Sequence, residues 1–190
     1  MLFKTFIAST FAAVSVLGAP PVSLESRQAV NYFTPSALWK YNVRNGAIAR
    51  TTQGVVSKAD YNHGNDFTAL LTFTYPRAAE GKKCQFAFVL DNTAQLRGSK
   101  KLDVFTSNSP APGPTSGWGP GNQRNIHLGR LSAKRGATAT WDATYNAYLT
   151  KKTPCKAAGT QEGFELVGVY DNDYISWNPR FAGPRIIYTR

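Results

Sequence analysis

Short runs in which apolar residues recur at every second position are the feature that most restricts how this chain folds. In the run DFTALLTFTY, residues 66–75, the side chains of Phe67, Leu71 and Phe73 share one face, and threonines occupy the other. Four further runs alternate in the same way: CQFAFVLD at 84–91, ATATW at 137–141, GFELVGVYD at 163–171 and PRIIYTR at 184–190. Alternate side chains of a strand lie on opposite faces, so the sequence predicts an all-β fold.

Gly, Pro, Asn and Ser separate these runs, and no long segment has a helical period. We expect roughly eight to ten short strands in an antiparallel β-sandwich, jelly-roll-like or of the Greek-key type. In the run 163–171, Phe164, Leu166 and Tyr170 are predicted to share the buried face. The runs GAIART at 46–51 and KLDVFT at 101–106 are weaker strand predictions.

Residues 1–19 have the pattern of a secretory signal peptide. Lys4 supplies a positive charge, residues 6–17 are apolar, and small residues end the stretch at Ala19. The apolar stretch is too short to span a bilayer, so we expect secretion and no membrane span. Residues 20–28, PPVSLESRQ, lack any period and are predicted to be a disordered N-terminus or a pro-segment cut after Arg27. Residues 29–190 remain as a single β-sandwich domain.

Two cysteines, Cys84 and Cys155, lie downstream of this segment. In an oxidising compartment their simplest fate is one disulfide, which would contribute roughly 4 kcal/mol to stability. The alternative is a nucleophilic cysteine, which would need a histidine base, and the only histidines are His63 and His127.

The chain carries a net charge of +11, and about +10 once residues 1–27 are removed. Such a charge favours acidic partners such as acidic polysaccharide, anionic lipid or nucleic acid. The charges are spread along the sequence, however, and the densest clusters are the doublets Lys82-Lys83 and Lys151-Lys152. Scattered basic residues also serve solubility alone, so nucleic acid stays a weaker alternative.

Four motifs follow one another in a recognisable order. LTFTYP at 71–76 leads to GKKCQFAFVLDNTAQL at 81–96, Cys155 precedes FELVGVYDND at 164–173, and NPRFAGP at 178–184 precedes the last β run. This order resembles the fungal family of the But2 (ubiquitin-three-binding protein) C-terminal domain, over about residues 66–188. The chain ends in YTR where that family often has a cysteine, and neither the segment 107–124 nor residues 33–43 fit the pattern.

The resemblance implies a secreted or cell-surface fungal β domain without a defined activity. It supplies no catalytic residue, cofactor or metal ligand. The family name refers to an intracellular partner, which a secreted chain is not expected to meet. We therefore expect a monomeric, non-catalytic binding or effector-like domain, located outside the cell or in the cell wall.

The candidate binding residues are Trp118, Arg124 and Arg130. Residues 107–124 contain four prolines and four glycines, a composition that a central strand does not tolerate. Trp118 lies in this segment, where an exposed indole would form a platform for a sugar ring or a partner protein. The alternative is a Trp118 that folds back into the core. Arg124 and Arg130 would add a salt-dependent attraction to an acidic glycan or to a cell-wall or host surface protein.

A small basic secreted hydrolase is the alternative function. His63 and His127 with a carboxylate would suit a ribonuclease, and Asp171 with Asp173 would suit a glycosidase or a hard cation. Surface histidines and a turn between two strands explain the same residues. Trp39 either stacks a base or packs, and Trp177 is expected to pack.

Overall fold

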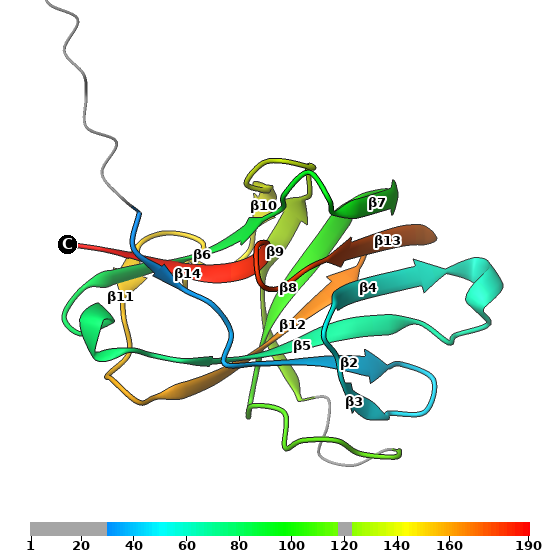
Figure 1. The fold of residues 1–190 in the computed structure, drawn as a ribbon, viewed down its shortest axis with the longest axis horizontal. Helices are drawn as coiled ribbons and strands as arrows, with labels where there is room; N and C mark the ends of the chain where they lie inside the picture. The colour runs from blue at the N-terminus through cyan, green and yellow to red at the C-terminus, as the bar shows by residue number, and fades with distance from the viewer. Residues whose placement is uncertain (1–29, 118–122) are drawn as a thin grey trace, which may run out of the picture.

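The computed structural model describes residues 30–117 and 123–190, and these form two curled antiparallel sheets packed face to face (Figure 1). The predicted antiparallel β-sandwich is therefore confirmed. The strands are β1 Tyr32–Phe33, β2 Ala37–Asn42, β3 Ile48–Arg50, β4 Gly54–Ala59, β5 Phe67–Thr74, β6 Lys83–Val89, β7 Gln95–Gly98, β8 Lys101–Ser107, β9 Arg124–Ser132, β10 Thr140–Thr144, β11 Thr153–Pro154, β12 Gln161–Gly168, β13 Asn172–Trp177 and β14 Gly183–Thr189. The described helical structure is two short 3-10 turns, η1 Asp60–Asn62 and η2 Arg77–Ala79, and neither is long enough to cross a membrane.

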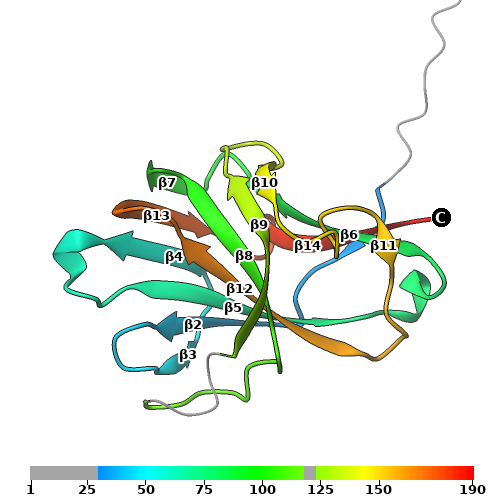
Figure 2. The ribbon, with the colours of Figure 1, turned by 180° about the vertical axis from the view of Figure 1, so that it is seen from behind.

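The small sheet has the strand order β1-β14-β6-β11. The large sheet has the order β10-β9-β8-β12-β5-β4-β13-β7, and β2 also pairs with β5 and carries β3 on its other edge. Both views place β11 and the C-terminus at one end of the molecule, and the β4–β5 turn with η1 at the other (Figures 1 and 2). The strands at 101–107 and 48–50, the weaker predictions, are β8 and β3, and β8 is an interior strand of the large sheet.

The core lies between the two sheets and is built by the alternating apolar positions. Phe73 of β5, Phe86 of β6 and Phe164 of β12 are at most 2% exposed, and their ring centroids lie 5.5–6.4 Å apart. Each ring comes from a run in which the sequence alternates, so the predicted buried faces are the ones that meet. Burying aromatic rings in contact supplies much of the stabilisation of such a core.

Trp177 fills the core beneath the neighbouring strands. It is 1% exposed and packs edge-to-face on Phe88 at 5.2 Å, which confirms that it packs. Two glycines make room for its indole. A Cβ atom at Gly54 would lie 1.9 Å from the ring and one at Gly183 would lie 2.2 Å from it. No residue with a side chain fits at either position while Trp177 keeps its place.

The disulfide between Cys84 and Cys155 is present, as predicted. Cys84 lies near the start of β6, and Cys155 follows β11, which pairs with β6 through Thr153 and Cys84. The bridge therefore fastens the segment before β12 to the small sheet, next to the core.

A second apolar cluster lies on the opposite face of the large sheet. It contains Trp39, Tyr41, Ile48 and Leu70, with Ala111 of the Gly/Pro-rich segment packed against it. This segment is anchored there, because Ile48 and Thr115 exchange two backbone hydrogen bonds of 3.0 and 3.1 Å. Trp39 is 7% exposed, so it packs instead of offering a free face to a base.

Candidate functional site

The candidate site lies on the outer face of the large sheet, which we define as the face that points away from the small sheet. In β8, Leu102 and Val104 are buried in the core, so the alternate residues Asp103 and Phe105 point to the outer face. Neighbouring strands add charged and aromatic residues at matching positions. Phe105 pairs with His127 of β9 and with Glu165 of β12, and Asp103 pairs with Arg130.

A buried carboxylate forms one end of this row. Glu165 is fully buried, and Arg124 donates to both of its oxygens over 3.0 and 2.8 Å. Thr68 of β5 donates a further hydrogen bond of 2.7 Å to Glu165 Oε1. Burial of the Arg124 guanidinium opposes its charge, but the contacts with Glu165 outweigh this and raise the pKa of Arg124. A buried charge pair of this kind holds both side chains in one geometry.

An aromatic stack forms the middle of the row. His127 lies against Phe105 with ring centroids 4.3 Å apart and planes 19° apart, and Tyr145 covers it at 4.6 Å. The strand pairing shifts on both sides of Phe105, which is how β9 presents His127 there. His127 Nε2 lies 3.4 Å from Asp103 Oδ1, and Tyr145 is 58% exposed. The stack therefore joins an exposed phenol ring to the charged residues beside it.

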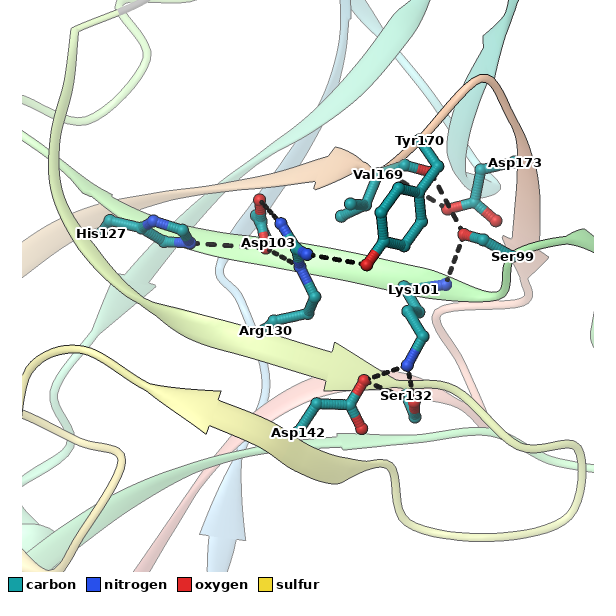
Figure 3. Close-up of polar contacts among 10 residues, drawn as sticks. All are labelled: Ser99, Lys101, Asp103, His127, Arg130, Ser132, Asp142, Val169, Tyr170 and Asp173. Carbon is teal, nitrogen blue, oxygen red and sulfur yellow. Dashed lines mark hydrogen bonds and ion pairs between the residues drawn. The ribbon is translucent and has the colours of Figure 1, made fainter.

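Asp103, Arg130 and Tyr170 form the other end of the row (Figure 3). Arg130 donates to both carboxylate oxygens of Asp103 over 2.8 and 3.0 Å, and to the Tyr170 hydroxyl over 3.1 Å. Its guanidinium also lies over the Tyr170 ring, 5.2 Å from the centroid. The hydrogen bonds to Asp103 raise the pKa of Arg130, so the guanidinium keeps its positive charge. Two flat groups are thus held next to each other at the surface.

The position of Tyr170 corrects one expectation. β12 ends at Gly168, and Tyr170 lies in the following turn with a positive φ of 64°, so it leaves the face that Phe164 and Leu166 share. It is 53% exposed instead of buried. The period of two residues holds only within the strand, so it does not predict which way the side chain of a later residue such as Tyr170 points.

An ion pair between Lys101 and Asp142 extends the row toward β10 (Figure 3). Ser132 donates to the same carboxylate over 2.9 Å, and the contact with Lys101 lowers the pKa of Asp142. On the other side, Arg124 lines a cavity of about 140 Å³ together with Lys58, Phe67 and Val167. The outer face thus presents paired charges between a small hollow and two exposed tyrosines.

The predicted binding residues have different outcomes. Trp118 lies outside the described residues. Arg124 and Arg130 both lie on the outer face of β9, but each is paired with a carboxylate of this chain. Their charge is therefore largely used internally, and a role in binding stays a prediction.

The residues proposed for a hydrolase do not come together. His63 lies in the turn between β4 and β5, whereas His127 lies on β9, which β8 and β12 separate from β5. Asp171 is exposed and Asp173 is buried, so this pair does not converge on one ligand. Over residues 30–117 and 123–190, no group of three or more His, Cys, Asp or Glu side chains could hold a metal ion.

Asp173 stabilises the fold through hydrogen bonds to the backbone. Its carboxylate accepts backbone hydrogen bonds from Lys100 over 2.8 Å and from Val169 over 3.4 Å, and so fixes the β12–β13 turn to the start of β8. Burial raises the pKa of Asp173 to about 6 against these hydrogen bonds. The turn interpretation of the YDNDY stretch agrees with this geometry.

The residues that sequence reasoning missed are Asp103, Phe105, Tyr145 and Tyr170. Asp103 and Phe105 alternate with Leu102 and Val104 in KLDVFT, so the period of two contained a signal for them. Tyr145 and Tyr170 lie in turns, where no periodicity assigns a face.

A comparison with protein-family models matches residues 35–181 to a family described as the ubiquitin 3 binding protein But2 C-terminal domain. No curated protein matches the chain. The matched residues include every outer-face residue described above, from β2 to β13.

Proposed function

We propose that this chain, which belongs to the But2 C-terminal domain family, is a non-catalytic binding domain that recognises a protein through the outer face of its large sheet. The family's description names a protein that binds another protein, which supports this kind of activity. The two-sheet sandwich provides a rigid support, because the charged outer-face residues project from paired strands, and they hold Tyr145 and Tyr170 of the adjoining turns in place.

The observation that carries the proposal is the row of paired charges with two exposed tyrosines beside it. Tyr145 and Tyr170 are 58% and 53% exposed, and both are held by contacts with His127 or Arg130. Tyrosine and arginine are enriched at protein interfaces, and a prearranged side chain loses little conformational freedom when a partner binds. The hollow beside Arg124 would admit a side chain of the partner.

The charge pairing favours a protein over an acidic glycan on this face. Arg124 and Arg130 are already neutralised by Glu165 and Asp103, so an acidic glycan would have to compete with buried or half-buried carboxylates. A protein can use the same pairs without breaking them, because its own polar groups dock onto their exposed edges.

We place this domain outside the cell, at a fungal cell wall or a host surface. The signal-like pattern of residues 1–19 and a disulfide between the two cysteines support this location. The partner would accordingly be a wall or surface protein instead of the intracellular one in the family's name.

The test is binding of the purified secreted chain to isolated cell walls, before and after protease or glycosidase treatment of the walls. The Tyr145→Ala/Tyr170→Ala variant should bind about tenfold or more weakly, because central aromatic contacts dominate interface affinity. Protease treatment of the walls should remove the part of the binding that depends on Tyr145 and Tyr170.

Phe181→Ala provides the matched control, since Phe181 is 71% exposed but lies in the turn between β13 and β14, at the other end of β13 from Tyr170. Equal binding by the double variant and the unmodified chain would reject the outer face. If the part of the binding that depends on Tyr145 and Tyr170 survives protease and is lost with glycosidase, the protein partner is rejected.

A further inference from the structure

Two lysine doublets that are far apart in the sequence meet at one edge of the small sheet. Lys82 and Lys83 lead into β6, and Lys151 and Lys152 lead into β11. Antiparallel pairing places Pro154 opposite Lys83, and the Cys155 N–H donates to the Lys82 carbonyl over 2.8 Å. The Cys84–Cys155 disulfide fastens the same two segments. The fold thus joins the two densest charge clusters of the sequence into one.

The charges of these lysines are not balanced within the described part of the chain. No ion pair there includes Lys82, Lys83, Lys151 or Lys152. The contrast with Lys156, the next lysine along, is informative, because it lies 2.8 Å from buried Glu162 and is neutralised. The doublets therefore form a positive cluster that is open to an external anion.

A groove of about 600 Å³ runs along this cluster. Lys82, Lys152 and Arg190 line it, together with Asn31, Tyr188 and Thr189. The Lys82 ammonium lies over the Tyr188 ring, 4.9 Å from its centroid, which holds this charge at the groove instead of letting it extend into solvent.

We propose that this groove is a binding site for an acidic polysaccharide. Ammonium groups at both sides attract carboxylate or sulfate groups, and the Asn31 amide can hydrogen-bond to sugar hydroxyls. A single-stranded nucleic acid would need free aromatic faces for stacking. Among the described residues that line the groove, Tyr188 is the aromatic one, and the Lys82 ammonium lies over its ring. The groove thus has the donors that a charged sugar chain needs.

This site is separate from the outer face. β6, β11 and β14 belong to the small sheet, which packs on the opposite, inner face of the large sheet. β11, which directly follows Lys151 and Lys152, lies at the same end of the molecule as the C-terminus (Figure 1). A domain with both sites could hold the wall polysaccharide at one end while the outer face engages a protein.

The test measures binding of the full secreted chain to three probes: heparin for sulfate, polygalacturonate for carboxylate and dextran as a neutral control. We expect binding to at least one acidic probe, none to dextran, and a loss of affinity as salt rises. Lys82→Gln/Lys152→Gln should weaken binding by about tenfold, since it removes two screened contacts. Lys152→Gln alone, at an exposed position that does not affect folding, should weaken it severalfold.

Lys100→Gln/Lys134→Gln is the matched control. These two lysines are exposed, lie close together because Ala133 N–H donates to the Lys100 carbonyl, and belong to no ion pair in the described residues. An equal loss in this control would show that net charge alone attracts the polymer and would overturn the site. So would unchanged binding of Lys152→Gln, or equal binding to dextran. Tyr145→Ala/Tyr170→Ala should bind the acidic probe normally, so failure of the outer-face proposal would be recognised independently.

Discussion

The two arginine–carboxylate pairs on the outer face show how burial decides how much one residue contributes to the free energy of unfolding. Arg124 and Arg130 lie on the same strand and each forms two hydrogen bonds to a carboxylate, but Glu165 is fully buried while the side chain of Asp103 is 15% exposed. Water can replace Arg130 at Asp103 and cannot replace Arg124 at Glu165. The two arginines therefore make different predictions.

Replacing Arg124 with Ala should lower the free energy of unfolding by about 3 kcal/mol, because it leaves a buried carboxylate without its cation. Arg130→Ala should cost about 1 kcal/mol or less, as for exposed pairs. Urea unfolding at neutral pH measures both values. Equal losses for the two variants would contradict the distinction.

Asp173 predicts a pH dependence of stability. Its pKa in the folded chain is raised to about 6, above the value of 3.8 that applies when unfolded. Between these two values the folded state binds more protons than the unfolded state, so its contribution is complete below about pH 4 and is lost as pH rises through about 6. As pH rises through this window, the free energy of unfolding of the unmodified chain should fall by about 2–3 kcal/mol relative to that of Asp173→Asn.

Urea unfolding of both proteins at several pH values from 4 to 7 measures this difference. A difference that stays constant would mean that burial does not perturb Asp173. A difference that changes in the opposite direction would mean that the two backbone hydrogen bonds outweigh burial.

Strands and their connections differ in how well the sequence predicts them. The runs at 66–75, 84–91 and 163–168 became β5, β6 and β12 with their apolar faces in the core, because a period of two has one interpretation where one face is buried. Short strands such as β1, β7 and β11 have only two to four residues, too few to show a period, and their positions depend on partners distant in sequence.

Close packing between β4, β13 and β14 predicts the effect of a glycine substitution. Gly54→Ala should lower the free energy of unfolding by about 3 kcal/mol, because its Cβ would lie 1.9 Å from Trp177. Gly159→Ala is the control, since it has φ of +81° but open space around it, and should cost about 1 kcal/mol. Thermal unfolding compares them. A smaller loss at Gly54 than at Gly159 would contradict the packing described here.

The Cys84–Cys155 disulfide, which links β6 to the residue after β11, is expected to stabilise the folded chain. Its loop has a sequence separation of 71, for which the chain-entropy model gives about 4 kcal/mol. Cys84→Ala/Cys155→Ala should lose about this amount in urea unfolding, and its lysine doublets should bind acidic polysaccharide less tightly because they are no longer fastened together. A variant with unchanged stability would show that the bridge does not constrain the unfolded chain.

At the scale of the whole molecule, convergence of distant residues was the part that the sequence did not predict. Lys82 lies just before Cys84 and Lys152 just before Cys155, the two cysteines of the predicted disulfide. Their side-by-side position also depends on the β6–β11 pairing, and β11 has only two residues, too few to be predicted from the sequence. The outer face likewise needs β8, β9 and β12 side by side. The period of a strand predicts which of its side chains share a face, but only the strand order decides which strands lie side by side and form a site.

The most direct test of the outer face as a protein-binding surface is site-specific photo-crosslinking on intact cell walls. A photoreactive phenylalanine analogue would replace Tyr170 in one protein and Phe181 in another, since both residues are exposed and lie on turns at opposite ends of β13. We predict a discrete crosslinked protein from position 170 that is absent from position 181 and disappears with excess unmodified chain. Equal crosslinking from both positions, or none from position 170 while the chain remains bound to the wall, would contradict the proposed function.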